Sequence, residues 1–197
     1  ESKHGTIFEN ASYSLIVIGV SRSLSHEFVR HRAGICFGQR SQRYTNEADT
    51  NFIEPQVVAN NPEAHALFVE TMTYLKDRYV QLADILQSAI QAELPDGVQI
   101  QNLSIDERTE VRKKVRQAAR CVLPNATETV LFVTANARAW RHFLEMRCSP
   151  HAEPEIRRLA YMIWRKLVAA APNLFGDYKE YTLPDGSLVL ETKYVKV

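Results

Sequence analysis

The chain has 197 residues, of which 45% are hydrophobic and 24% charged, a composition typical of a globular protein large enough to bury a core. Its 24 Lys and Arg residues nearly balance 23 Asp and Glu residues, which argues against a protein whose whole surface binds nucleic acid, so any cationic site must be local. The three cysteines form no CxxC pair, which argues against zinc motifs and disulfide frameworks and favours a cytoplasmic location.

The first predicted elements are a strand and a helix. Residues 13–20 (YSLIVIGV) are β-branched and apolar on both faces, which predicts a buried strand. Ser21 is a suitable cap for a helix over 22–32, in which three side chains recur at helical spacing: Leu24, Phe28 and His31. Gly34 and Gly38 are then expected to interrupt regular structure.

A loop and a long helix follow. The polar stretch 45–61 predicts the loop, and Pro62 begins the helix, because proline is favoured in the first turn. The helix ends at the turn over 94–97. Its apolar residues alternate spacings of four and three and form a seam suited to packing against another helix or another subunit: Phe68, Met72, Leu75, Tyr79, Leu82 and Leu86.

The second half of the chain predicts two helices with a strand between them. One helix covers 106–121, led by two acidic residues and stopped before Pro124. The strand covers 127–134, after which Asn136 is a good cap for a helix that reaches about Met146.

The last long helix, 155–171, has an apolar stripe typical of a core-facing helix: Ile156, Leu159, Ala160, Ile163, Trp164, Leu167, Val168 and Ala171. The turn over 184–186 precedes an extended segment over 187–195. We see no repeat and no clear domain boundary, so the prediction is an α+β fold in one domain spanning 1–197.

The densest cluster of chemistry lies in residues 30–44 (RHRAGICFGQRSQRY), which combine four arginines, a histidine, a serine and a tyrosine with two glycines. Forked cationic donors beside a hydroxyl group and a flexible backbone are what a phosphate-bearing ligand needs. The alternative is that Arg30 to Arg32 end a helix, where cations suit the dipole, and that the rest is a solvated loop.

This stretch resembles the signature of the flavin-dependent thymidylate synthases: RHR, seven residues, then Ser, with Arg and Tyr soon after. Here eight residues, 33–40, precede Ser41, one more than in the family pattern. The resemblance continues in several ordered blocks, which together are far more specific than one short motif: 4–9, 21–30, 120–129, 136–147 and 151–157.

The resemblance implies a small sheet with long helices, assembled as a homotetramer whose active sites are shared between chains. It implies that a methylene group passes from 5,10-methylenetetrahydrofolate to C5 of a uridine monophosphate, and that FAD, reduced by NADPH, supplies the hydride. No cysteine nucleophile is required, which fits a chain in which no cysteine has an evident base partner. The family normally has a further strand and helix ahead of the segment with which this chain begins, so we expect native sequence ahead of Glu1.

The resemblance also assigns residues. Arg147 is expected to be catalytic, because its guanidinium would stabilise negative charge on the uracil ring. The expected flavin contacts are Thr6, Arg30, His31, Arg32, Gln39, Asn136, Arg138 and His142. The expected substrate contacts are Glu27, Phe28, Val29, Arg30, Gln39, Arg40, Ser41, Gln42, Arg43, Arg120 and Arg147. No metal site is expected.

Single residues of these blocks also have structural interpretations. Asn136 could be only a helix cap, His142 a half-buried helix histidine, and Arg147 a complement to a helix C-terminus. Ser41 could be a nucleophile, a phosphate ligand or a loop residue; with no base adjacent in sequence, the ligand role is favoured. Cys36 is interpreted as structural.

The extra residue of the signature suggests a hypothesis about the sugar. One residue spans at most ~3.6 Å, so a longer loop can displace the wall of a pocket. We therefore expect that UMP, with its 2′-hydroxyl, is accepted as well as dUMP, as in the UMP/dUMP methylases of nucleoside-antibiotic (polyoxin) biosynthesis that the chain then resembles.

Two rival functions stay open. The segment 111–120 (VRKKVRQAAR) is typical of a solvated helix face, but with the RHR residues it could form a nucleic-acid-binding module; the near-zero net charge and lack of interleaved aromatic residues argue against it. The other rival is a family-like chain that has lost catalysis and serves as a structural subunit. No apolar run approaches the roughly 20 residues of a membrane helix, so we expect no membrane partner.

Overall fold

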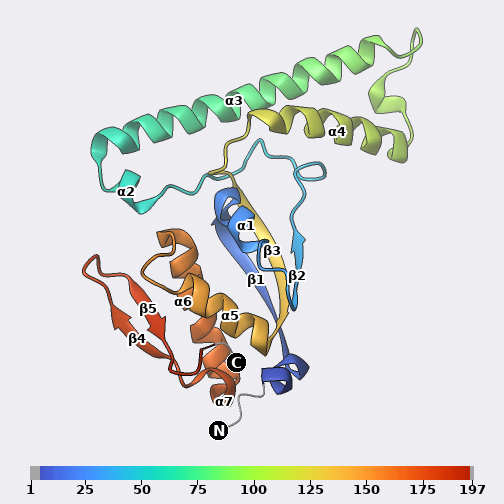
Figure 1. Cartoon of the computed structure of the whole chain (residues 1–197). Coiled ribbons are helices and arrows are strands. Elements are labelled where there is room, and N and C mark those ends of the chain that lie inside the picture. The colour runs from blue at the N-terminus through green and yellow to red at the C-terminus, as the bar shows by residue number, and fades with distance from the viewer. Residues whose placement is uncertain (1–4, 196–197) are drawn as a thin grey trace. The chain divides into compact units, whose positions relative to one another are not determined.

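The computed structural model describes residues 5–195, and the chain divides into two compact units (Figure 1). Unit 1 is formed by the two ends of the chain, up to Gln39 and from Val130 onward, and unit 2 by Arg40–Thr129. Strands and helices alternate without βαβ repetition, which confirms the predicted α+β class.

Unit 1 contains a three-stranded sheet in the order β1-β3-β2, formed by β1 (Ser12–Ser21), β2 (Ile35–Gln39) and β3 (Glu128–Asn136). Strand β2 is antiparallel to β3. The predicted strand over 13–20 is confirmed, but the expectation that both of its faces are buried is wrong. Val17 is 5% exposed, whereas Ile16 and Ile18 on the other face are 70% and 69% exposed.

Strand β2 lies where the two glycines predict a break in regular structure, so that prediction is wrong. Gly38 instead pairs with Phe132 inside the ladder. The hidden pattern is alternation: Ile35 is buried and Phe37 half-buried, whereas Cys36 is exposed. A strand that carries its small residues on the outer face shows too little apolar alternation to be recognised from sequence.

The helices that border the site are capped as predicted. Helix α1 (Arg22–Phe28) begins at Ser21, whose Oγ accepts a hydrogen bond from Leu24 N at 2.9 Å. It ends four residues before the predicted Arg32, because the next backbone hydrogen bonds span only three residues, from Arg30 N to Glu27 O and from His31 N to Phe28 O. Helix α5 (Ala137–Arg147) is capped by Asn136, whose Oδ1 accepts from Ala139 N at 2.8 Å.

The remaining elements of unit 1 surround its core. They are a 3-10 helix, η1 (Gly5–Asn10), helices α6 (Pro154–Ala170) and α7 (Pro172–Phe175), and a hairpin of β4 (Lys179–Thr182) with β5 (Leu188–Glu191). The hairpin turn was predicted, and Gly186 has the positive φ of +80° that such a turn requires.

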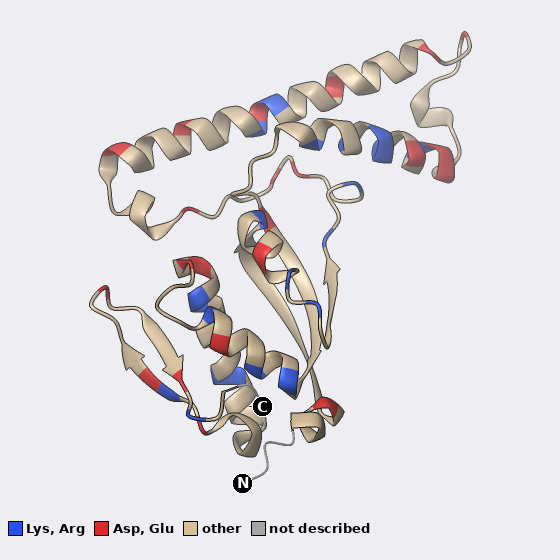
Figure 2. Cartoon of the chain, in the orientation of Figure 1, with Lys and Arg blue, Asp and Glu red and all other residues tan. Residues whose placement is uncertain are grey.

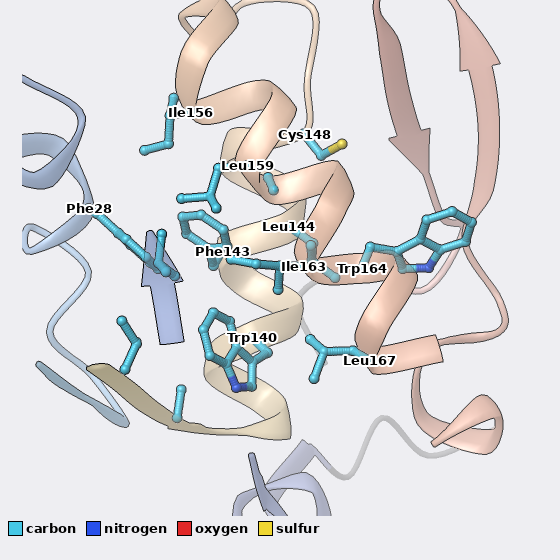
Figure 3. Close-up of a cluster of buried hydrophobic side chains, with 14 of the residues drawn as sticks. Phe28, Trp140, Phe143, Leu144, Cys148, Ile156, Leu159, Ile163, Trp164 and Leu167 are labelled. Atoms are coloured by element: carbon cyan, nitrogen blue, oxygen red, sulfur yellow. The ribbon is translucent and has the colours of Figure 1, made fainter. Parts of the chain in front are cut away.

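The core of unit 1 joins α1, α5 and α6 (Figure 3). Phe28 of α1 packs against Phe143 of α5 with ring centroids 4.5 Å apart, and Trp140 closes the same cluster. Most of the predicted α6 stripe is confirmed as core, with Val168 and Ala171 half-buried. Each fully buried side chain of this size contributes roughly 1.5–3 kcal/mol, so the core holds α5 firmly at the site.

Unit 2 is built on two long helices that pack against each other (Figure 1), α3 (Pro62–Ala92) and α4 (Ile105–Ala119). The unit also contains α2 (Gln56–Ala59), inside the stretch predicted as a loop, and the short η2 (Ile100–Asn102) and η3 (Arg120–Val122). The predicted seam on α3 packs at least partly within the unit, since Tyr79 is 1% exposed.

Charge on unit 2 is spread over both helices: Figure 2 shows basic residues along α4 and acidic residues along α3. Several cations of α4 have local partners, such as Lys113 with Glu110 and Arg116 with the carbonyl of Tyr44. Within residues 5–195, no helix is long and apolar enough to cross a membrane, and no group of three or more His, Cys, Asp or Glu side chains is arranged to hold a metal ion.

Candidate functional site

A pocket of about 410 Å³ lies in unit 1 between the segment after α1 and one face of α5. Its volume is within the range of small-molecule sites. The residues that line it are Arg30, His31, Arg32, Ala33, Ile35, Ala139, His142, Met146 and Arg147. Five of the predicted site residues are therefore brought together in one pocket: both outer arginines and the histidine of RHR, His142 and Arg147.

The backbone around Gly34 brings the two walls of the pocket together. Gly34 has a φ of +73°, and its carbonyl accepts a hydrogen bond from Asn136 N at 3.1 Å. A Cβ at this position would lie 2.8 Å from Asn136 Nδ2 and 3.1 Å from Ala139 Cβ. Glycine is required for two independent reasons, its backbone conformation and the close approach of the N-terminus of α5.

We predict that Gly34→Ala lowers the free energy of unfolding by about 2–3 kcal/mol, because left-handed backbone strain of about 1–2 kcal/mol adds to the contact with Asn136. Gly186→Ala is the matched control, since Gly186 has a φ of +80° but open space around it. Urea unfolding of both variants measures the difference. Equal destabilisation would show that the approach to Asn136 has no energetic weight.

Arg147, the last residue of α5, is held at the edge of the pocket by two side chains from the α1 segment. Its Nη1 donates to Glu27 Oε2 at 2.8 Å, and its Nε donates to His31 Nε2 at 3.0 Å. The side chains of Arg147 and Glu27 are 25% and 28% exposed, so this ion pair is largely shielded from water. A shielded, hydrogen-bonded guanidinium has a defined orientation, unlike an exposed arginine.

The electrostatics of the two partners differ. Burial lowers the pKa of His31 to about 4, and the positive charge of Arg147 and the neighbouring His142 act in the same direction, so the ring is neutral at physiological pH. The pKa of Glu27 is raised, first by burial and then by Glu153, although Arg147 partly opposes this shift.

The other predicted flavin contacts of unit 1 are not among the residues that line the pocket. Asn136 caps α5, and Arg138 Nη1 donates to Glu9 Oε1 at 2.6 Å. Thr6 is exposed on η1, an element that packs against α5. Gln39, at the end of β2, donates from Nε2 to Ser25 Oγ at 3.0 Å. His4, part of the resemblance, lies outside the described residues.

Two predicted substrate contacts at the end of α1 do not line this pocket. The Phe28 side chain is 0% exposed and belongs to the aromatic core, so only its backbone could reach a ligand. Val29 is half-buried at the C-cap of α1. The resemblance places Phe28 among the substrate contacts, whereas helical geometry turns its side chain into the core.

In unit 2, the turn that begins at Ser41 is anchored to α4. The carbonyl of Ser41 accepts hydrogen bonds from the backbone N–H groups of Tyr44 and Thr45, both at 3.1 Å. Arg43 Nη1 donates to Gln117 Oε1 at 3.3 Å, and Arg116 donates to the carbonyl of Tyr44. The turn therefore lies beside the last part of α4, whose C-cap is the predicted substrate residue Arg120.

The remaining two predicted substrate contacts in unit 2 are Arg40 and Gln42, whose surroundings within the unit differ. Arg40 Nη2 lies 3.5 Å from the carboxylate of Glu47, which is 1% exposed, and donates to the carbonyl of Glu128 at 3.3 Å. Gln42 is 6% exposed, and within the described residues its Nε2 has no hydrogen-bond partner. An unpartnered buried amide is costly, so Gln42 has hydrogen-bonding capacity that a ligand or water could satisfy.

Sequence reasoning missed the apolar wall of the pocket, formed by Ala33, Ile35, Ala139 and Met146. The sequence contains a pattern that predicts part of this wall. Ala139, His142 and Met146 follow one another at spacings of three and four, which places them on one face of a helix. Ile35 could be assigned only once β2 was known.

Comparison with known proteins gives a consistent result. A family model described as Thymidylate synthase complementing protein matches residues 1–173. A protein of Mycobacteroides abscessus named Flavin-dependent thymidylate synthase is 43% identical over 189 residues, which cover 96% of this chain and 70% of that protein. Proteins of the same name from Mycolicibacterium gilvum and Corynebacterium efficiens are 45% and 40% identical, over 94% and 99% of this chain and 69% and 73% of their own lengths.

Proposed function

The chain belongs to the family of flavin-dependent thymidylate synthases, which are enzymes, and from this premise we propose that it methylates C5 of the uracil ring of dUMP. In this proposal the donor is 5,10-methylenetetrahydrofolate and the reductant is NADPH. The observation that carries the proposal is the meeting of the RHR segment and Arg147 in one pocket, where a shielded guanidinium lies beside a cationic rim.

The pocket has the chemistry that FAD requires. Ile35, Ala139 and Met146 give an apolar wall for a flat ring system, while Arg30 and Arg32 at the rim offer forked donors for a pyrophosphate. We assign the flavin to this pocket, which His31 and His142 also line. Further flavin contacts are assigned to the other predicted residues of unit 1: Thr6, Gln39, Asn136 and Arg138. FAD, when bound, supplies the hydride of the reductive methylation.

The protein's own contribution is binding and polarisation. We assign the uracil ring to Arg147, whose fixed guanidinium stabilises negative charge at the N3 and O2 region and so makes C5 nucleophilic. The nucleotide phosphate is assigned to Ser41, Arg43 and Arg120, which supply a hydroxyl and two forked donors. Ser41 is a ligand in this scheme, since its Oγ accepts from Arg43 N at 3.4 Å and no base contacts it among the described residues.

The direct test is incubation of the chain with FAD, NADPH, 5,10-methylenetetrahydrofolate and dUMP, followed by mass analysis of the nucleotide. A gain of one methyl group coupled to NADPH oxidation is expected. No methylated product, from a chain that binds FAD and the nucleotide, would contradict the proposal and favour the catalytically inactive subunit.

A parallel incubation with UMP tests the hypothesis about the sugar. The longer spacing before Ser41 supports acceptance of UMP as well as dUMP, while the names of the relatives refer to thymidylate. Gly34, which is part of this spacing, lies against Asn136 and Ala139, and Ala139 lines the pocket that we assign to the flavin. We expect both nucleotides to be methylated; a strict preference for dUMP would remove the hypothesis and, with it, the likeness to the antibiotic-pathway enzymes.

We predict that Ser41→Ala weakens dUMP binding about 10- to 100-fold, the equivalent of one hydrogen bond to a charged group, and leaves flavin reduction by NADPH unchanged. Equilibrium titration with dUMP measures the first quantity and stopped-flow absorbance the second. Ser187→Ala, a change at a hairpin hydroxyl of unit 1, is the control. Wild-type dUMP affinity in Ser41→Ala would remove Ser41 from the phosphate site.

We also propose that the chain assembles as a homotetramer with shared active sites. The support from this chain is the outer face of the unit 1 sheet, where Ile16, Ile18 and Phe132 are 70%, 69% and 53% exposed. Adjacent apolar side chains of this size on a sheet are typical of protein interfaces. Light scattering of the purified chain, and of an Ile16→Lys variant expected to dissociate, measures the assembly; a monomeric wild type would contradict the proposal.

A further inference from the structure

The contacts of Arg147 divide its guanidinium into a held part and a part available to a ligand. Nε and Nη1 donate to His31 and Glu27, at 3.0 Å and 2.8 Å. Among residues 5–195, Nη2 has no hydrogen-bond partner, so its two N–H groups can serve a ligand. Two donors fixed in different directions define the plane of the fork, which one ion pair alone would not do.

His31 can hold Arg147 only as a neutral ring. A guanidinium donates and never accepts, so Nε2 of His31 must be the acceptor and the ring proton must be on Nδ1. The ring is fixed by edge contacts, with centroids 5.2 Å from Phe143 and 5.9 Å from His142. The lowered pKa of His31, about 4, agrees with this state.

We infer that Glu27 and His31 are positioning residues, which act on the reaction by fixing the orientation of Arg147. The inference rests on the proposed function and reassigns Glu27, which the resemblance places among the substrate contacts. The physical reason is that a misplacement of about 1 Å at a reacting centre can cost up to about 10²-fold in rate. Without these two partners Arg147 keeps its positive charge, but its guanidinium group no longer has a fixed orientation.

A double-mutant cycle on the FAD-loaded chain tests the inference, with Glu27→Gln, Arg147→Lys and both changes together. Glu27→Gln alone is expected to slow single-turnover methylation of dUMP about tenfold, while flavin reduction by NADPH is unchanged. If Glu27 acts through Arg147, the double variant is no slower than Arg147→Lys alone. Effects that multiply would overturn the inference and return Glu27 to direct substrate contact.

Glu180→Gln is the matched control, because it makes the same chemical change at an exposed carboxylate of unit 1 that contacts Tyr161. It is expected to keep the wild-type rate. A wild type that does not methylate dUMP would refute the proposed function rather than the positioning contact, which is then tested by a measurement independent of activity.

That measurement is the ¹⁵N NMR signal of His31. In the wild type we expect a neutral ring protonated on Nδ1 from about pH 5 to about pH 8. Arg147→Met removes both the donor and the positive charge, so the tautomer preference should be lost and the pKa should rise toward the unperturbed 6.5. A His31 signal that is the same in Arg147→Met and wild type would overturn the inference, whether or not the chain is active.

Discussion

Arg147→Lys is expected to lower the single-turnover rate of dUMP methylation by about 10²- to 10³-fold, the usual cost of removing one preorganised donor from a reacting centre. Lysine keeps the positive charge but replaces a planar fork by one ammonium group. It cannot contact Glu27 and His31 as Arg147 does and also present an N–H pair to the uracil ring.

Two half-reactions separate this role from a general loss of structure. Reduction of bound FAD by NADPH should be retained in Arg147→Lys, because the proposed role of Arg147 concerns the nucleotide. Arg165→Lys, the same change on the exposed side of α6, is the control and should behave as wild type. If methylation in Arg147→Lys stayed within a few-fold of wild type, the uracil ring would have to be polarised by another group.

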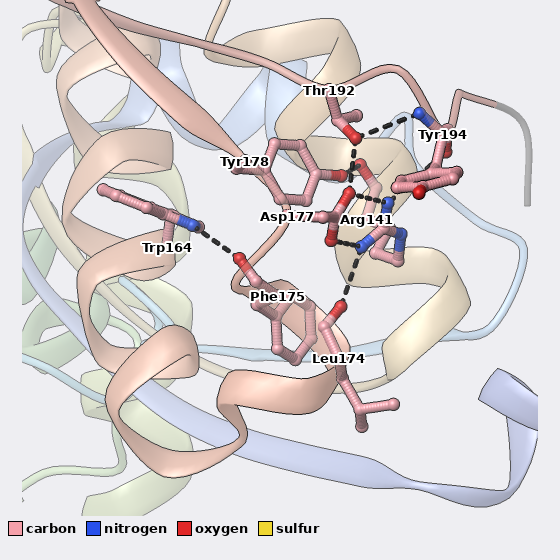
Figure 4. Close-up of polar contacts among 8 residues, drawn as sticks. All are labelled: Arg141, Trp164, Leu174, Phe175, Asp177, Tyr178, Thr192 and Tyr194. Atoms are coloured by element: carbon pink, nitrogen blue, oxygen red, sulfur yellow. Dashed lines mark hydrogen bonds and ion pairs between the residues drawn. The ribbon is translucent and has the colours of Figure 1, made fainter.

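The second large effect concerns stability. Arg141, one turn before the last turn of α5, is 3% exposed and joins α5 to the C-terminal part of unit 1 (Figure 4). Its Nη1 and Nη2 donate to the two oxygens of Asp177 at 2.6 Å and 2.8 Å, and it also donates to the carbonyls of Leu174 and Tyr194. We expect Arg141→Met to lower the free energy of unfolding by about 3 kcal/mol, because Asp177 then lies partly buried without its partner.

The pKa of Asp177 determines how this loss of unfolding free energy depends on pH. Burial favours a higher pKa for Asp177, but hydrogen bonds from Arg141 and Thr192 outweigh it, so the pKa is lowered from 3.8. A carboxyl group with a lowered pKa contributes stability above its unfolded value and loses it as the pH falls through the folded value. The difference in the free energy of unfolding between wild type and Arg141→Met should thus be largest above pH 3.8 and decrease below it.

Urea unfolding at a series of pH values measures both quantities. Arg165→Met is the control, because the same change at an exposed arginine of α6 should leave the unfolding midpoint unchanged. A gap between wild type and Arg141→Met that is absent at neutral pH, or that persists undiminished at about pH 2, would contradict the assigned ion pair.

Much of the fold could be predicted because its signals are local. Residue type predicts the caps Ser21 and Asn136, helical spacing predicts the apolar stripe of α6, and the Pro-Asp-Gly sequence predicts the last hairpin turn. One local signal was overlooked: Ser104 and Glu107 form a capping box at the start of α4, although its spacing is visible in the sequence.

What could not be predicted depends on contacts between distant segments. The partner of Arg141 is 36 residues away, and no spacing rule links them. The hydrogen bonds that hold Arg147 could not be predicted for the same reason, since Glu27 and His31 lie more than 110 residues before it. The resemblance to the family placed these side chains in one site, but only the tertiary structure shows which of them contact one another.

Cys148 follows Arg147 directly, is 0% exposed, and has a pKa raised to about 12 by burial, whereas Cys36 and Cys121 are exposed. A thiol-specific reagent should therefore modify two cysteines of the folded chain at once and the third only when the surrounding side chains separate. The slow labelling rate of Cys148, measured by mass spectrometry, then reports how often the protein opens transiently around this residue. Cys148 is next to the guanidinium group on which the chemistry is proposed to depend.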